Sequence, residues 1–164
     1  MKKLAAIALG SNLESRFGDR EANLWEAVER LRELGDVKAV SSSYDTKPVG
    51  YLNQPRFLNA ALLLETSLDP TDLMRALLEI EQAMGRDRVG AVAKGPRVID
   101  LDLLLYGQVV MNTTELTLPH PEMMGRRFVL EPLTEIAPGM IHPVLGLTVA
   151  EMARAAAVKQ PVKE

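Results

Sequence analysis

Strand-like and helix-like segments alternate along the first 106 residues in an order that few folds allow. Four short runs, three of them apolar and one rich in Val and Ser, predict strands. They cover residues 4–9, 37–44, 57–66 and 98–106. Two longer segments with apolar residues at helical spacing lie after the first and third runs. The predicted order is therefore β-α-β-β-α-β.

Both predicted helices have recognisable ends. Asp19 and Asp69 are N-cap residues, and Gly35 and Gly85 follow the last helical residues, where chains often leave a helix. The apolar faces comprise Leu24, Val28, Leu31 and Leu34 in the first helix and Leu73, Leu77, Ile80 and Met84 in the second. This order is the split βαβ arrangement of ferredoxin-like folds. We therefore expect an α+β fold in which helices pack on a mainly antiparallel sheet.

Further elements are appended after residue 106. Residues 109–111 are expected to pair with the preceding strand across Gly107 and Gln108. Thr148 and Glu151 form a capping box that starts a last helix.

Composition indicates one ordinary globular domain. The 164 residues are 47% hydrophobic and 25% charged, and they contain no internal repeat, so we expect a single domain over residues 1–164 with a flexible tail at 158–164. The absence of cysteine excludes thiol chemistry and favours a cytoplasmic location. A net charge of −3 argues against nucleic-acid or membrane partners. The oligomeric state stays open, with a monomer among the options.

Two aspartates lie two residues apart in the fourth predicted strand. Since strand side chains alternate between faces, Asp100 and Asp102 should point the same way, with their backbones about 6.6 Å apart. The opposite face is expected to carry Arg97, Ile99, Leu101, Leu103 and Leu105. Paired carboxylates repel each other unless a cation lies between them, and Mg²⁺ prefers oxygen ligands. The alternative is that both simply line the solvated face of an outer strand.

A glycine-containing basic segment precedes this pair. It carries Arg86, Arg88, Lys94 and Arg97 against Asp87 alone. Basic runs are commonly solvated surface, but beside paired carboxylates this one suits phosphate binding. Together the two features favour phosphoryl or pyrophosphoryl transfer through a metal-bridged nucleotide. No fixed role is assigned to Arg88 or Lys94.

Five motifs follow one another in order along the chain: Gly10-Ser11-Asn12-Leu13, Thr46-Lys47-Pro48-Val49-Gly50, Phe57-Leu58-Asn59-Ala60, Gly95-Pro96-Arg97 with Ile99-Asp100-Leu101-Asp102, and Pro119-His120 with Arg126 and Phe128. Together, over about residues 4–150, they resemble the 6-hydroxymethyl-7,8-dihydropterin pyrophosphokinase family. The first motif follows a strand but lacks the lysine and glycine spacing of a P-loop.

The resemblance implies transfer of pyrophosphate from ATP to the hydroxymethyl group of a reduced pterin, with release of AMP, in folate biosynthesis. It implies that Asp100 and Asp102 hold two Mg²⁺ ions and that Arg86 and Arg97 contact phosphates, these four residues being catalytic. No residue is identified as the general base. Two other functions stay open: a non-catalytic ferredoxin-like regulatory module that binds a nucleotide, and a kinase that moves only the γ-phosphate.

The resemblance also implies a pterin site. Phe57 and Phe128 would stack on the pterin ring, and Asn59, Thr46 and Val49 would meet its polar edge. Taken singly, phenylalanines at these positions would more commonly be core residues than ligand contacts. Asn59 in an apolar strand must find hydrogen-bond partners, and a ligand edge can supply them.

The nucleotide contacts implied by the resemblance are Glu81, His120 and Arg126, together with the two arginines named above. The other histidine, His142, is expected to be structural. Residues 47–54 and 86–94, rich in glycine, proline or charge, are expected to move when ligands bind.

Overall fold

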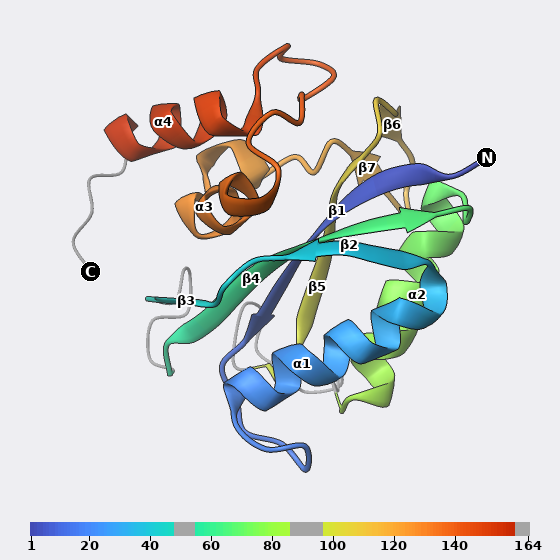
Figure 1. Cartoon of the computed structure of the whole chain (residues 1–164), viewed down its shortest axis with the longest axis vertical. Coiled ribbons are helices and arrows are strands. Elements are labelled where there is room, and N and C mark those ends of the chain that lie inside the picture. The colour runs from blue at the N-terminus through green and yellow to red at the C-terminus, as the bar shows by residue number, and fades with distance from the viewer. Residues whose placement is uncertain (48–54, 86–96, 160–164) are drawn as a thin grey trace.

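An antiparallel sheet runs through the middle of the molecule (Figure 1). The computed structural model describes residues 1–47, 55–85 and 97–159. The strands of this sheet are β1 (Lys3–Ser11), β2 (Asp36–Val40), β3 (Tyr44–Thr46), β4 (Phe57–Thr66) and β5 (Asp100–Tyr106). Their order is β2-β4-β1-β5, with β3 pairing to the start of β4, and each pairing is antiparallel. This is the ferredoxin-like α+β arrangement that the sequence predicts.

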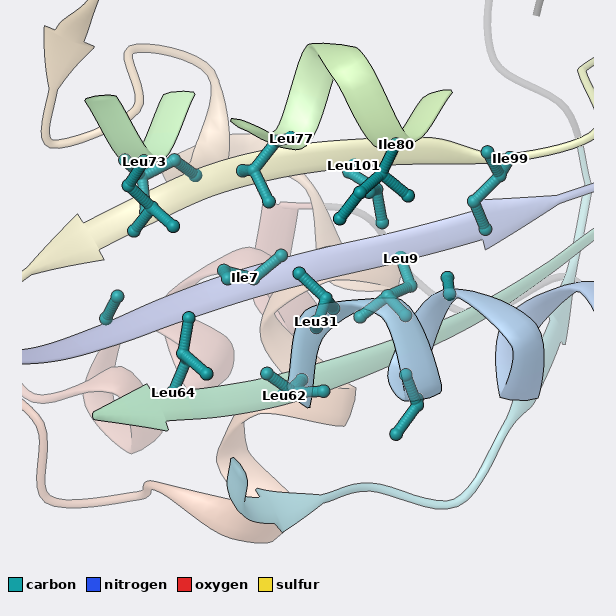
Figure 2. Packing of buried hydrophobic residues seen from close by; sticks show 14 of the residues in the cluster. Ile7, Leu9, Leu31, Leu62, Leu64, Leu73, Leu77, Ile80, Ile99 and Leu101 are labelled. Atoms are coloured by element: carbon teal, nitrogen blue, oxygen red, sulfur yellow. The ribbon is translucent and has the colours of Figure 1, made fainter. Parts of the chain in front are cut away.

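Helices cover both faces of the sheet (Figure 1). One face packs against α1 (Arg20–Leu31), its continuation η1 (Arg32–Leu34), and α2 (Pro70–Ala83). The other packs against α3 (Arg127–Ile136) and α4 (Val149–Lys159), with η2 (Met123–Gly125) leading into α3. Figure 2 shows leucine and isoleucine side chains of α1 and α2 meeting those of β1, β4 and β5.

Alternation along β1 divides the core in two. Ala5, Ile7 and Leu9 belong to the cluster under α1 and α2, whereas Ala6 and Ala8 belong to the cluster under α3 and α4. The central strand is therefore buried on both faces.

The helix starts confirm the predicted caps. Asp19 and Asp69 each accept a hydrogen bond at 2.9 Å from the backbone N–H three residues later. Thr148 and Glu151 exchange two hydrogen bonds, of 2.8 and 3.1 Å, as a capping box requires.

The single strand predicted at residues 37–44 is instead two strands, β2 and β3. Ser41 lies in the break, where its Oγ accepts from Ala61 N at 2.9 Å and donates to Ser42 O at 2.7 Å. Because the Ser41 hydroxyl accepts the N–H of Ala61 in β4, a side chain takes the place of a backbone acceptor in the ladder, which explains the interruption.

β5 begins at Asp100, later than the predicted strand, and carries a bulge. Consecutive residues of β1 pair with Leu105 and Leu103, so Leu104 has no register partner in β1. As a result Leu105 packs under α3 and α4, on the face opposite to the one that strict alternation assigned to it.

The strand predicted at residues 109–111 does not pair with β5. Gly107 adopts a φ of 53° and Val109 N donates to Tyr106 O at 3.0 Å, so the chain turns away from the sheet. Instead β6 (Met111–Asn112) pairs with β7 (Thr117–Leu118) in a small separate sheet.

The C-terminal helix α4 includes residues 158 and 159, which the sequence assigned to a flexible tail. Residues 160–164 lie outside the described part of the chain. Within that part, no helix has the length and apolar character needed to cross a membrane.

Candidate active site

A cavity of about 300 Å³ lies at one end of the sheet, where the last residues of β1 run between the first residues of β4 and β5. Ten of the twelve residues predicted to form the site line this cavity: Thr46, Phe57, Asn59, Glu81, Arg97, Asp100, Asp102, His120, Arg126 and Phe128. The two others, Val49 and Arg86, lie outside the described residues. So do Arg88, Lys94 and, of the segments expected to move, residues 48–54 and 86–94.

The two aspartates share one face of β5, as alternation predicts. Asp100 pairs in register with Gly10 and Asp102 with Ala8, on the face of the sheet that α3 and α4 cover. Arg97 was expected on the opposite face, and this expectation is wrong. Because Arg97 precedes the strand, alternation does not apply to it, and its Nη1 lies 3.8 Å from Asp100 Oδ1 beside the cavity. A cation therefore lies beside Asp100, and Asp102 lines the same cavity.

Aromatic and amide groups form another wall. Phe57 and Asn59 point from the start of β4 to the same face, and Thr46 of β3 pairs with Phe57. Asn59 is 7% exposed, and its Nδ2 donates to Thr46 Oγ1 at 2.5 Å. Phe128, in the first turn of α3, approaches from the helical side. Two aromatic rings and an amide in one cavity suit a flat heterocycle that carries donors and acceptors at its edge.

The segment before α3 brings a cation and an imidazole. Arg126 pairs with Glu122 at 2.8 Å, and its guanidinium centre lies 5.6 Å from the centre of the Phe128 ring. Burial, reinforced by the positive charge of Arg126, lowers the pKa of His120, although Glu122 and Asp100 oppose this shift. The His120 Nδ1 accepts from the Glu122 backbone N–H at 3.2 Å. The neutral ring therefore carries its proton on Nε2, as a donor.

The remaining wall comes from α2. Glu81 is 2% exposed, and its Oε2 accepts from the Leu101 backbone N–H at 2.7 Å, which joins α2 to β5 between the two aspartates. Met74 and Leu78 add apolar surface to the cavity. Met74 was not predicted to be a site residue. Its spacing of four from Leu78 was the available signal, because it forms a second stripe beside the core face of the helix.

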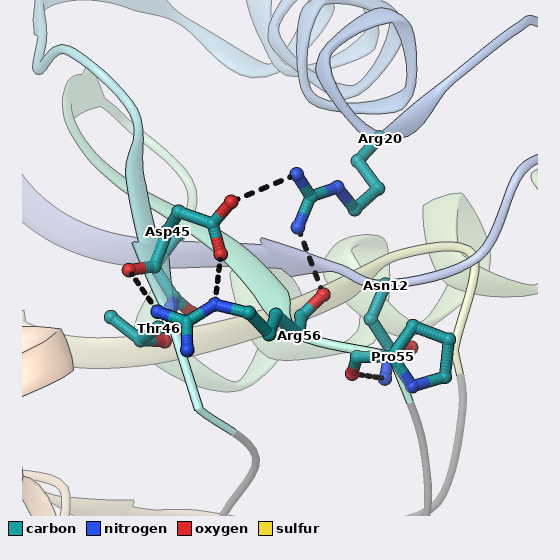
Figure 3. Close-up of polar contacts among 7 residues, drawn as sticks. Asn12, Arg20, Asp45, Thr46, Pro55 and Arg56 are labelled. Carbon is teal, nitrogen blue, oxygen red and sulfur yellow. Dashed lines mark hydrogen bonds and ion pairs between the residues drawn. The ribbon is translucent and has the colours of Figure 1, made fainter. Parts of the chain in front are cut away.

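A polar network outside the cavity holds β3 in place (Figure 3). The Asp45 carboxylate bonds Arg20 Nη2 at 3.1 Å and Arg56 Nε at 2.8 Å, while Arg20 Nη1 donates to Arg56 O at 2.9 Å. The Arg20 guanidinium, and then that of Arg56, lower the pKa of Asp45. The network ties the short strand that carries Thr46 to α1 and β4. Nothing in the sequence pattern predicted it, because its members are far apart along the chain.

Known proteins resemble this chain over most of its length. A family model for 7,8-dihydro-6-hydroxymethylpterin-pyrophosphokinase (HPPK) matches residues 6–138. The 2-amino-4-hydroxy-6-hydroxymethyldihydropteridine pyrophosphokinase of Bacillus subtilis is 46% identical over 83% of this chain and 79% of its own length. The protein of that name in Pseudomonas aeruginosa is 44% identical over 84% and 82%.

Longer proteins also contain a matching region. The folic acid synthesis protein fol1 of Pneumocystis carinii is 41% identical over 88% of this chain, which spans only 19% of that protein. A Plasmodium falciparum HPPK-DHPS structure superposes with a TM-score of 0.75, covering 97% of this chain and 46% of that one at 16% identity, and so supports the fold. On the family match and the bacterial relatives, the chain belongs to the 7,8-dihydro-6-hydroxymethylpterin-pyrophosphokinase family.

Proposed function

We propose that this chain transfers the pyrophosphate group of ATP to the hydroxymethyl oxygen of 6-hydroxymethyl-7,8-dihydropterin, as a step of folate biosynthesis. In this reaction the hydroxyl oxygen bonds to the β-phosphorus of ATP. The bond from that phosphorus to the oxygen bridging the α-phosphate breaks, AMP leaves with that oxygen, and the hydroxyl proton is lost. The observation that carries the proposal is that paired carboxylates and an aromatic wall with an amide face the same cavity.

The pterin is assigned to the aromatic wall. Phe57 and Phe128 offer ring faces for stacking, and neither belongs to the fully buried core. Asn59 and Thr46 line the same cavity as a polar pair joined by their own hydrogen bond. Since the Asn59 Nδ2 already donates to Thr46, its Oδ1 is the atom suited to accept from a ring N–H. Val49 is proposed to add a contact at this edge.

Magnesium is assigned to Asp100 and Asp102. Among the described residues, no group of three or more His, Cys, Asp or Glu side chains could hold a metal ion by itself. Mg²⁺ characteristically takes one or two carboxylates and fills its other positions with phosphate oxygens and water, so this pair fits ions that arrive with a nucleotide. We propose two ions, which when bound would neutralise phosphate charge and lower the pKa of the attacking hydroxyl.

The nucleotide is assigned to the cationic side. Arg97 and Arg126 are placed to meet phosphate oxygens, and Arg86 is proposed to assist them. His120 can donate Nε2–H to a phosphate or sugar oxygen, because its lowered pKa keeps it neutral and its Nδ1 already accepts a hydrogen bond. Glu81 is proposed to contribute near the nucleoside while holding the backbone between the aspartates. ATP and an easily oxidised reduced pterin together favour a cytoplasmic location.

Product analysis tests the function. The chain is mixed with ATP, Mg²⁺ and 6-hydroxymethyl-7,8-dihydropterin, and nucleotides are separated by chromatography. We expect AMP and the pyrophosphorylated pterin in equal amounts. ADP would instead indicate a kinase that moves the γ-phosphate. Binding of ATP without any turnover would indicate a regulatory module.

Variants of the acid pair test the assigned chemistry. Asp100→Asn and Asp102→Asn should each lower kcat/KM at least about 100-fold, because each removes charge that stabilises the reacting phosphates. The free energy of unfolding should stay near the wild-type value, since both side chains are only partly buried. Asp36→Asn, an exposed strand aspartate paired with Lys2 far from the cavity, is the matched control. Full activity in either cavity variant would contradict the assignment.

A further inference from the structure

The Gly10-Ser11-Asn12-Leu13 motif includes a side chain to which the proposed function gives no role. Asn12 follows the end of β1 and is 2% exposed. Its Nδ2 donates to Pro55 O at 3.0 Å (Figure 3), and its Oδ1 accepts from Arg97 N at 2.7 Å. Its own backbone N–H donates to Arg97 O at 3.0 Å. One buried residue thus bonds the main chain of two distant segments.

These two segments lead into opposite sides of the cavity. Pro55 precedes Phe57 by two residues, at the start of the strand that supplies the aromatic and amide wall. Arg97 is itself on the phosphate side and precedes the acid pair by three residues. Because the partners of Asn12 are backbone atoms, its hydrogen bonds set the position of the chain on both sides and not only the rotamer of one side chain.

We propose that Asn12 is a positioning residue that couples the pterin side of the cavity to the phosphate side. The inference rests on the proposed function, since it concerns the two ligands assigned there. A ligand that shifts the main chain at Arg97 acts, through the Asn12 amide, on the main chain at Pro55, and the reverse also holds. Such coupling must be reciprocal: each ligand changes the affinity for the other by the same factor.

The chemistry of an asparagine is required for this role. Its planar amide presents one acceptor and one donor in fixed directions, which matches one N–H and one carbonyl. Aspartate keeps the acceptor for Arg97 but has no donor for Pro55. Alanine removes both, so the two variants separate the two halves of the contact.

Asn23 provides a matched control. It is also a buried asparagine, with an exposed fraction of 0%, close to the same turn. Its amide bonds Ser11 Oγ at 3.1 Å, Leu13 O at 2.7 Å and Ser15 Oγ at 2.5 Å. All of these partners lie within residues 11–15, so Asn23 supports the turn without reaching the cavity. Asn23→Ala therefore reports the effect of a structural asparagine alone.

The experiment measures binding coupling by calorimetry. The Kd of a non-hydrolysable ATP analogue with Mg²⁺ is determined with and without saturating pterin, and the ratio is the coupling factor. We expect a factor above one in the wild type and at least a fivefold fall in Asn12→Ala and Asn12→Asp. Asn23→Ala should keep the wild-type factor even if its melting temperature falls. An unchanged factor in both Asn12 variants, or no coupling in the wild type, would overturn the inference.

Amide hydrogen exchange gives a readout that does not depend on the ligands. The Arg97 N–H should exchange faster in Asn12→Ala but remain protected in Asn12→Asp and Asn23→Ala. Equal protection in all variants would contradict the contact. A wild type that makes no AMP would refute the proposed reaction, whereas an active wild type with unchanged coupling in both Asn12 variants would refute the positioning role alone.

Discussion

The substitution Gly10→Ala, which adds one methyl group, is expected to weaken pterin binding while leaving the stability of the fold nearly unchanged. Gly10 lies near the end of β1, paired with Asn59 and Asp100, and its φ is not positive, so alanine can adopt its backbone without strain. An added Cβ would lie 3.2 Å from Asn59 Oδ1 and 3.7 Å from Phe57 Cδ1. The carbon–oxygen contact is too short, so the Asn59 amide must move by a few tenths of an ångström. Gly10→Ala therefore acts on the wall assigned to the pterin.

The expected magnitudes follow from these contacts. Weakening one hydrogen bond from Asn59 to the pterin costs about 0.5–1.5 kcal/mol, which corresponds to a rise in pterin KM of about 2- to 12-fold. Folding changes little, because replacing glycine in an unstrained site contributes about 0.4–1 kcal/mol through the unfolded chain and offsets the tight contact. The KM for ATP should stay within about twofold of the wild-type value.

Steady-state AMP release at varied pterin, then varied ATP, measures both constants, and urea unfolding measures stability. Gly139→Ala is the control, since a Cβ there meets nothing within 4 Å. A pterin KM equal to that of the control would refute the assignment of the Asn59 amide to the pterin edge. A loss of several kcal/mol in the free energy of unfolding would refute the inference that a small movement of the Asn59 amide alone relieves the contact.

Three further substitutions test the polar network around β3, the buried His142, and the close approach of Gly35 to the backbone of Glu65. Asp45→Asn removes the charge that two guanidinium groups bind, so stability should fall by about 0.5–1 kcal/mol in urea unfolding, with pterin KM rising more than ATP KM. Equal rises would contradict a role specific to β3. Burial lowers the pKa of His142 and of His120 in the folded chain. Below about pH 6.5 the unfolded chain therefore binds more protons than the folded chain, and the free energy of unfolding of the wild type should fall between about pH 7 and 5.5. In His142→Asn the amide oxygen can still accept the two backbone N–H bonds made to Nδ1, so this variant should lose less stability over the same pH range. If its free energy of unfolding depends on pH as steeply as that of the wild type, the lowered pKa of His142 is contradicted. Gly35→Ala would place a Cβ 2.2 Å from the Glu65 carbonyl oxygen, and we expect a loss of about 3 kcal/mol or more in urea unfolding, whereas wild-type stability would disprove the close approach.

The elements that the sequence predicted well are those with local causes. β4 spans the predicted residues 57–66, and both aspartate caps and the capping box form as expected. A cap depends on a side chain and a backbone N–H three residues apart, and strand alternation depends on neighbours in the chain. Both can therefore be read without knowing the fold.

The elements that were predicted wrongly depend on partners far along the chain. The bulge that moves Leu105 to the other face arises from the register of β5 on β1, and the break at Ser41 arises from a contact with Ala61. The backbone of Arg97, which lines the cavity, is held by Asn12, and no periodicity in residues 97–106 could indicate this contact between distant residues.

For the site, the linear pattern was enough to name the residue types, their order and their resemblance to a family. It could not show that Thr46, Glu81, Asp102 and Phe128 line one cavity, nor that Met74 joins them. Capping and alternation are settled by interactions over a few residues. The distance between walls is settled by strand register and by helices packed on opposite faces of the sheet, which exist only once the whole chain has folded.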